Sequence, residues 1–146
     1  MIVVDTTLLL YAVGGDHPLR QLSLRLIEAV RGGSIHATTT VEVIQEFAHA
    51  FARRRDRRDA GRLGCAWAAL LAPLISTTRE DLEHGLALWE RHPTLGAFDA
   101  LLAAVALARE AEALVSADRA FGAVTGLRYV DPATPALDDL LSSQAP

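Results

Sequence analysis

Acidic residues occur at several positions in this sequence where a carboxylate is unusual or well placed for chemistry. Asp5 directly follows the apolar run 2–4, and Asp118 lies two residues beyond the apolar run 113–116. Asp99 stands in the segment 97–105, which contains little else that is polar. A buried carboxylate is costly unless it is paired or stays protonated. Asp99 in particular therefore indicates a functional site.

Two further acids, Glu42 and Glu46, are one helical turn apart in a predicted helix and so share one side of it. Glu46 adjoins Phe47 and falls within the apolar register. Purely structural interpretations also exist. Asp5 and Asp118 suit helix N-caps or turns, Asp99 could bind the backbone at a helix start, and both glutamates could face solvent. Glu42 could also favour the helix dipole.

A cluster of these carboxylates would require a cation. Neighbouring carboxylates raise each other's pKa, so folding disfavours such a group unless positive charge occupies it. Ligands that are all oxygen atoms suit Mg²⁺ or Mn²⁺ rather than zinc. The five histidines are scattered without a metal-ligand spacing, and Cys65 is interpreted as core filler in an apolar helix. Nucleophile-elbow, P-loop and dinucleotide-binding motifs are absent from the sequence.

The elements that must position these acids alternate between strand and helix. Strands are predicted at 1–4, 34–37, 113–116 and 127–130, with a weak strand at 74–76. Helices are predicted at 6–13, 17–30, 40–53 (capped by Thr40), 59–71 (capped by Asp59), 78–91 (capped by Thr78), 97–110 and 119–124. This alternation predicts an α/β fold with a mostly parallel sheet, and wholly apolar strands predict that both faces are covered. In such sheets ligands bind beyond the carboxyl ends of the strands, where Asp5 and Asp118 lie.

Length and composition predict one domain, 1–146, with a tail rich in proline, serine and aspartate from about 132 onward. A hydrophobic content of 51% is ample for a core without disulfides, and Cys65 is the single cysteine. With no signal-peptide pattern, we expect a reducing cytoplasm. The longest apolar stretch, 63–75, is broken by Pro73 and is too short to span a membrane.

The net charge of −4 does not favour nucleic-acid binding, but the distribution of charge does. All 14 basic residues are arginine, and five of them fall within six positions: Arg53, Arg54, Arg55, Arg57 and Arg58. We interpret this basic segment as a candidate phosphate-contacting edge. A solvated turn, or charge facing a protein partner, is the alternative. Trp67 and Trp89 are expected in the core or an interface.

Four segments, in order, resemble the motifs of PIN-domain proteins, particularly VapC-type toxins of toxin–antitoxin pairs. Segment 2–11 is similar to the opening motif, an apolar strand followed by Asp5, the polar pair Thr6 and Thr7, and an apolar helix. The segments 39–47, 98–104 and 114–121 resemble the later motifs, with acids at Glu46, Asp99 and Asp118. Order and spacing agree across nearly the whole chain. Thr7 is a departure, because many family members have asparagine there.

The resemblance implies a three-layer PIN-like fold and a Mg²⁺- or Mn²⁺-dependent endoribonuclease. It implies Asp5, Glu46, Asp99 and Asp118 as catalytic acids, with Asp5, Asp99 and Asp118 as metal ligands. Thr6, Thr7, Ser116 and Glu42 would be supporting polar residues. It also implies an RNA substrate, a cognate antitoxin that blocks the site, and a homodimer.

Other functions are less consistent with the residues. A catalytically silent PIN-like module that binds RNA or protein would not need all four acids. A response-regulator receiver needs an acidic pair after its first strand and a lysine, and this chain contains no lysine. A haloacid-dehalogenase phosphatase carries a second aspartate two positions after the first, where Thr7 stands.

Overall fold

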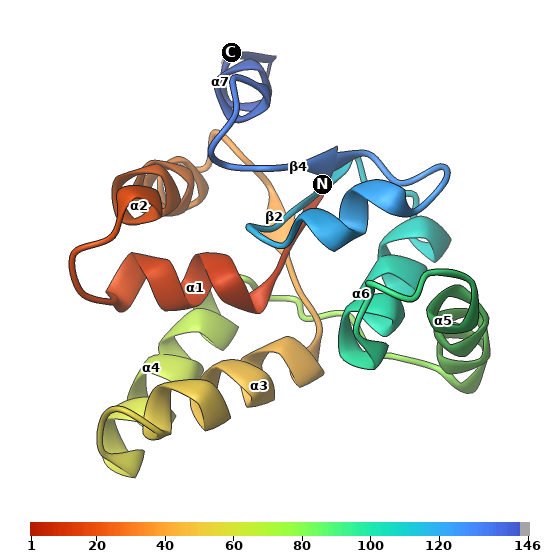
Figure 1. The fold of residues 1–146 in the computed structure, drawn as a ribbon. Coiled ribbons are helices and arrows are strands. Elements are labelled where there is room, and N and C mark those ends of the chain that lie inside the picture. The colour runs from red at the N-terminus through yellow and green to blue at the C-terminus, as the bar shows by residue number, and fades with distance from the viewer. Residues whose placement is uncertain (144–146) are drawn as a thin grey trace.

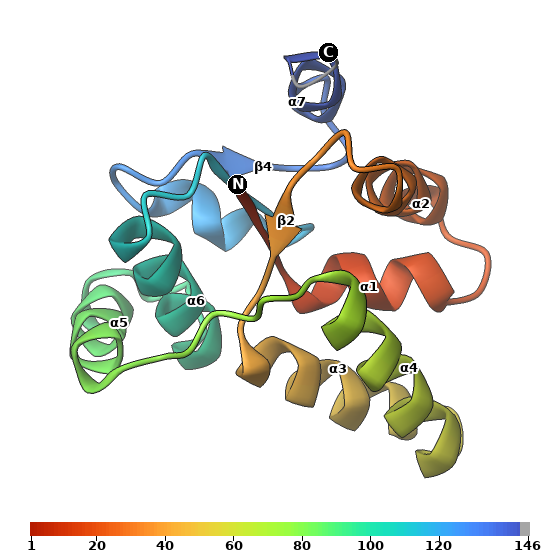
Figure 2. The ribbon, with the colours of Figure 1, turned by 180° about the vertical axis from the view of Figure 1, so that it is seen from behind.

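The computed structural model describes residues 1–143 and has a four-stranded, fully parallel central sheet (Figures 1 and 2). The strands are β1 (Ile2–Val4), β2 (Ala37–Thr38), β3 (Ala113–Val115) and β4 (Tyr129–Val130), in the spatial order β2-β1-β3-β4. The predicted α/β fold with a parallel sheet flanked by helices is therefore confirmed.

Helices cover both sides of this sheet (Figure 1). They are α1 (Thr6–Val13), α2 (Pro18–Arg31), α3 (Val41–Ala52), α4 (Arg57–Leu70), α5 (Arg79–Arg91), α6 (Ala97–Ala108), the 3₁₀ turn η1 (Arg119–Ala123) and α7 (Ala136–Ser143). The pair α5 and α6 packs together on one side, whereas α1 packs on α2 and α3 on the other, and α4 packs on α3. None of the helices in residues 1–143 has the length and hydropathy of a membrane span.

The sheet is the centre of the core. Every residue of β1 and β3 is fully buried, as expected for strands covered on both faces. Ile2 lies opposite Ala37 on one neighbour and Ala113 on the other. Because all strands run the same way, their carboxyl ends share one edge, and Asp5 follows β1 at that edge.

Local capping explains why most helices begin where the sequence predicts. Asp5, Thr40 and Thr78 accept backbone N–H groups at the starts of α1, α3 and α5. The predicted cap of α4 was wrong. Asp56, and not Asp59, caps this helix, because the extended backbone at Asp56 lets its carboxylate accept the N–H of Asp59 at 2.9 Å.

Two predicted strands differ from the structure. The strand predicted at 34–37 is shifted to Ala37–Thr38, since Gly33 takes a positive φ of 75° and Ser34 still bonds back to α2. The strand predicted at 74–76 is only a single bridge from Ile75 to Thr40. Side chains bind carbonyl groups in and directly before this segment: Arg109 donates to Ser76, and Thr38 donates to Pro73.

The C-terminal region contains a helix that was not predicted from the sequence. The tail expected from about 132 contains α7, whose Leu137 and Leu140 are buried, while 144–146 lie outside the described residues. Cys65, expected in the core, is exposed. Its helix turns Ala60, Gly64 and Trp67 inward, and Cys65 falls on the other side. Trp89 is half-exposed at 49%.

Candidate active site

The first carboxylate of the site is held by hydroxyl groups. Asp5 is 3% exposed, and its Oδ2 accepts hydrogen bonds from Ser116 Oγ at 2.7 Å and Thr7 Oγ1 at 2.8 Å. The Thr7 backbone N–H adds a longer bond of 3.3 Å to the same oxygen. Asp5 is therefore both the N-cap of α1 and a carboxylate presented at the sheet edge, so its structural and functional interpretations coincide.

Glu46 joins this group from α3. Its Oε2 accepts a hydrogen bond of 2.7 Å from the hydroxyl of Thr6, which precedes Thr7 in α1. The sequence placed Glu46 within the apolar register of its helix, and that was wrong. Glu46 is exposed, and its buried neighbour Phe47 faces the core instead.

Asp99 experiences the strongest electrostatic perturbation in the site. Its pKa is raised from 3.8 to about 7, first by burial and then by the negative charges of Asp5, Asp118 and Glu46. The hydrogen bond that Asp99 accepts from the backbone of Gly96 opposes this rise only in part. The backbone at the helix start therefore favours the charged form of Asp99, while burial and the charges of three other acids disfavour it.

Ser116 and Thr7 join the ends of two adjacent strands. Ser116 is fully buried and accepts the backbone N–H of Asp118 at 2.9 Å while donating to Asp5. Thr7 Oγ1 accepts the N–H of Ala117 at 3.1 Å. Asp118 in turn caps η1 through Ala120. The hydroxyl that replaces the expected asparagine therefore has well-defined partners.

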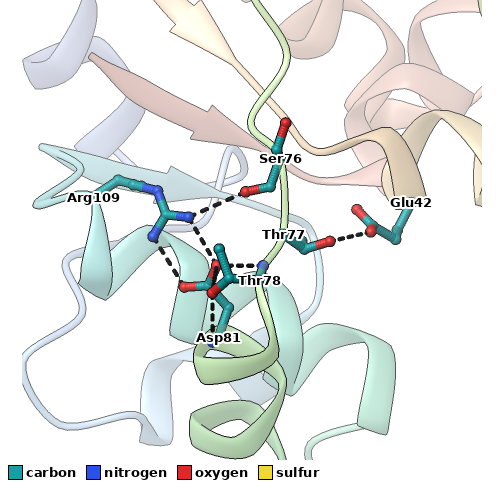
Figure 3. A network of polar contacts seen from close by, with 6 residues as sticks. All are labelled: Glu42, Ser76, Thr77, Thr78, Asp81 and Arg109. Atoms are coloured by element: carbon teal, nitrogen blue, oxygen red, sulfur yellow. Dashed lines mark hydrogen bonds and ion pairs between the residues drawn. The ribbon is translucent and has the colours of Figure 1, made fainter.

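Glu42 points to a different contact. It is half-buried, and its Oε1 accepts a hydrogen bond from the hydroxyl of Thr77, in the segment before α5 (Figure 3). Glu42 is not among the groups that raise the pKa of Asp99. The structure thus brings Thr6, Thr7 and Ser116 to the acids but directs Glu42 elsewhere.

An ion pair fixes the helix that carries Asp99. Arg109, at the C-terminus of α6, donates to both oxygens of Asp81 at 3.0 and 2.8 Å and to the carbonyl of Ser76 (Figure 3). Asp81 also completes a capping box with Thr78 at the start of α5. The guanidinium of Arg109 is the main reason that the pKa of Asp81 falls to about 2. This contact clamps α5 to α6.

Two polar residues near this edge were missed in the sequence. Thr39 is fully buried and donates at 2.6 Å to the carbonyl of Val4, directly before Asp5. Asp131 follows β4, is buried, and receives the guanidinium of Arg119 at 3.3 Å. A carboxylate directly after an apolar strand is the signal that singled out Asp5, and it applies to Asp131 as well.

The donor set fits a hard divalent cation. All four acids offer oxygen atoms, and a bound cation would offset the negative charges that help to raise the pKa of Asp99. Within residues 1–143, no three carboxylate, imidazole or thiolate groups are close enough to one another to coordinate a single metal ion. The carboxylates therefore influence one another electrostatically, while Asp5 and Glu46 accept hydrogen bonds from hydroxyl groups.

A parallel sheet between helical layers, with Asp5 and Asp118 following two adjacent strands at its carboxyl edge, defines an α/β protein with a candidate acidic site. The chain belongs to the PIN-domain family, whose model, described as PIN domain, matches residues 2–127. The resemblance seen in the sequence is thereby confirmed.

Curated relatives extend this likeness over almost the full chain. The chain is 46% identical over 150 residues to Ribonuclease VapC7 of Mycobacterium tuberculosis, covering 99% of this chain and 100% of the relative. It is 31% identical over 128 residues to VapC ribonuclease Mb1869c of Mycobacterium bovis, covering 88% of this chain and 98% of that protein. Ribonuclease VapC13 of Mycobacterium tuberculosis matches to the same extent.

Proposed function

We propose that this protein is an endoribonuclease that hydrolyses RNA phosphodiester bonds and acts as the toxin of a toxin–antitoxin pair. The names of its relatives support this function. The observation that carries it is that Asp5 and Asp118 follow the adjacent parallel strands β1 and β3 at one edge of the sheet. Besides burial, the negative charges of Asp5, Asp118 and Glu46 raise the pKa of Asp99, so all four acids share one electrostatic environment. A silent binding module would have no use for such a destabilising group of charges.

Asp5, Asp99 and Asp118 are the proposed ligands of Mg²⁺ or Mn²⁺, with Glu46 as the fourth catalytic acid. When bound, the cation activates a water molecule and stabilises negative charge on the phosphate and the leaving oxygen. The negative charges that help to raise the pKa of Asp99 are those that a bound cation would offset.

The remaining residues keep these acids in place. Ser116 and Thr7 fix one oxygen of Asp5, and Thr6 fixes Glu46. A carboxylate of the site accepts the proton of the attacking water. Because water rather than the RNA 2′-hydroxyl attacks, we expect products with 5′-phosphate and 3′-hydroxyl ends.

The proposed assembly follows the family. We expect one nuclease domain over 1–146, acting in the cytoplasm as a homodimer. A cognate antitoxin would block the acidic site until the nuclease is released.

Sequencing of RNA 5′ ends after brief expression in cells tests the function. New 5′-phosphate ends should appear at defined positions with the wild-type protein and not with Asp5→Asn. The same ends with both proteins, or none with either, would contradict the proposal.

A further inference from the structure

A groove of about 660 Å³ lies beside the acidic site and is not used by the chemistry proposed above. It runs between α1 and the C-terminal end of α3. Half-buried apolar side chains of Leu10, Val13 and Phe51 line it, and the exposed residues Arg53, Arg54 and Arg55 stand along it. The groove therefore combines an apolar lining with a positively charged side.

The groove begins at the acidic site. Thr7, whose hydroxyl holds Asp5, is one of its lining residues. Helices α1 and α3 run side by side away from the sheet edge (Figure 1). On α1 the groove follows the helical spacing from Thr7 through Tyr11 to the glycine turn at Gly14, about 10 Å along the axis.

The wall of the groove formed by α3 also begins near an acidic residue, Glu46. Ala50 lines the groove and lies one turn after Glu46 on the same side of α3. Continuing in this direction, the chain reaches the basic segment at the end of the helix. A linear molecule seated between the acids would therefore be led along both helices toward the arginines.

A fixed aromatic pair stands at the far end. The rings of Tyr11 and His17 stack with centroids 4.3 Å apart and planes inclined by 19°. His17 Nδ1 accepts the N–H of Leu19 at 3.1 Å, which caps α2 and holds the imidazole ring in place. An aromatic platform that is already ordered loses little conformational entropy when a base stacks on it.

The charge of the groove favours a polyanion. Arg53, Arg54 and Arg55 take part in none of the ion pairs seen within residues 1–143, and Asp16 is the single acidic residue of the lining. Unpaired arginines beside aromatic and apolar side chains are what single-stranded nucleic acids bind, through phosphates and stacked bases.

We propose that this groove is a subsite for single-stranded RNA next to the cleaved phosphate. Tyr11 and His17 stack with a base, and Arg53, Arg54 and Arg55 contact phosphates. This inference rests on the proposed ribonuclease function. It also divides the basic segment, because Arg57 and Arg58 begin α4 and do not line the groove.

Binding of a fluorescein-labelled, short unstructured RNA, followed by fluorescence anisotropy in EDTA across a salt series, tests the subsite. Arg54→Gln should lower the log–log salt slope by about 0.7, one single-strand phosphate contact, whereas the control Arg57→Gln should leave the slope unchanged. Tyr11→Leu, which keeps apolar volume but removes the ring, should weaken binding roughly tenfold. Tyr11→Phe should bind as the wild type does.

His17→Asn provides a second variant, because asparagine can still cap α2 but offers no ring to a base. It should weaken binding in the same way as Tyr11→Leu while the thermal melt stays unchanged. Wild-type affinity and salt slope in Arg54→Gln, Tyr11→Leu and His17→Asn would overturn the subsite and leave the groove to a protein partner. If the wild-type protein neither binds nor, with Mn²⁺, cleaves RNA, the proposed function fails and the subsite fails with it.

Discussion

Ser116 Oγ donates a 2.7 Å hydrogen bond to Asp5 Oδ2 across 111 positions of sequence. Asp5 directly follows β1 and Ser116 directly follows β3, and these strands are adjacent and parallel. The bond therefore joins two halves of the acidic site at the edge of the sheet. Because Ser116 also accepts the N–H of Asp118, one hydroxyl positions two of the proposed metal ligands.

Ser116→Ala should weaken both stability and cleavage. The change removes a donor from buried Asp5 and an acceptor from the Asp118 N–H, so we expect a loss of about 1–3 kcal/mol in unfolding free energy. Urea unfolding and RNA cleavage measure the two effects. Ser34→Ala, at an exposed serine bonded to a carbonyl, is the matched control and should change neither. Wild-type activity in Ser116→Ala would contradict the positioning role.

Asp99→Asn should make the metal-free protein more stable at neutral pH. The folded-state pKa of Asp99 is about 7 against 3.8 normally, so the folded protein binds more protons than the unfolded chain between these values. The contribution of Asp99 to the free energy of unfolding is therefore fully present below pH 4 and is lost as the pH rises through 7. This loss is at most about 4 kcal/mol. Urea unfolding in EDTA at pH 4 and pH 8 should show matching stability at the lower pH and a gain for the variant at the higher pH.

The same variant should not cleave RNA, because an amide cannot replace the carboxylate at the metal. Asp16→Asn, in an exposed loop, serves as the control for stability. If Asp99→Asn instead loses stability at pH 8, the hydrogen bond to the backbone of Gly96 dominates and Asp99 is mainly a helix-start residue.

Asp81→Asn should destabilise the protein by about 2 kcal/mol at pH 7, since Arg109 loses its charged partner. The pKa of Asp81 is lowered to about 2, so this stability is present above pH 4 and disappears as the pH falls through 2. Glu83→Gln removes an exposed pair with Arg79 on the same helix and should have little effect. Equal unfolding free energies for the two variants would refute the clamp between α5 and α6.

A cognate antitoxin should place an arginine or lysine among the acids, where charge-assisted hydrogen bonds replace the charge of the metal. An apolar anchor should accompany it, because charge alone mainly guides association. Binding of the antitoxin in EDTA to wild type and to the Asp5→Asn, Asp99→Asn double variant tests this. The double variant should bind clearly more weakly. Equal affinity would mean inhibition from another surface.

Features fixed by local chemistry could be predicted from the sequence. Helix α1 has the predicted bounds, because local residues fix both of its ends. The apolar run 2–4 and the cap Asp5 precede its start, and glycines follow Val13. Asp5 and Asp118 could be grouped because parallel strands bring their carboxyl ends to one edge. Asp99 lies in α6 and could be added because it stands in an apolar segment and matches a motif of the family. The four motifs, found in the same order as in PIN-domain proteins, predicted the family.

Features that depend on tertiary packing could not be predicted. The local sequence around Leu137 and Leu140 does not show that they are buried, and the composition of this region predicts a tail and no helix at α7. Whether Glu42 or Glu46 meets the acids depends on Thr6 and Thr77, which lie far away in sequence. The stacked pair of Tyr11 and His17 likewise needs the turn between α1 and α2.

The most direct test of the central claim is the cleavage of RNA by purified protein with Mg²⁺ or Mn²⁺ and with EDTA. Cleavage should require the added ion, stop in EDTA, and be absent from Asp5→Asn at every metal concentration. Product ends should be 5′-phosphate and 3′-hydroxyl. Full activity in EDTA with divalent ions shown to be absent, or wild-type cleavage by Asp5→Asn, would contradict the account.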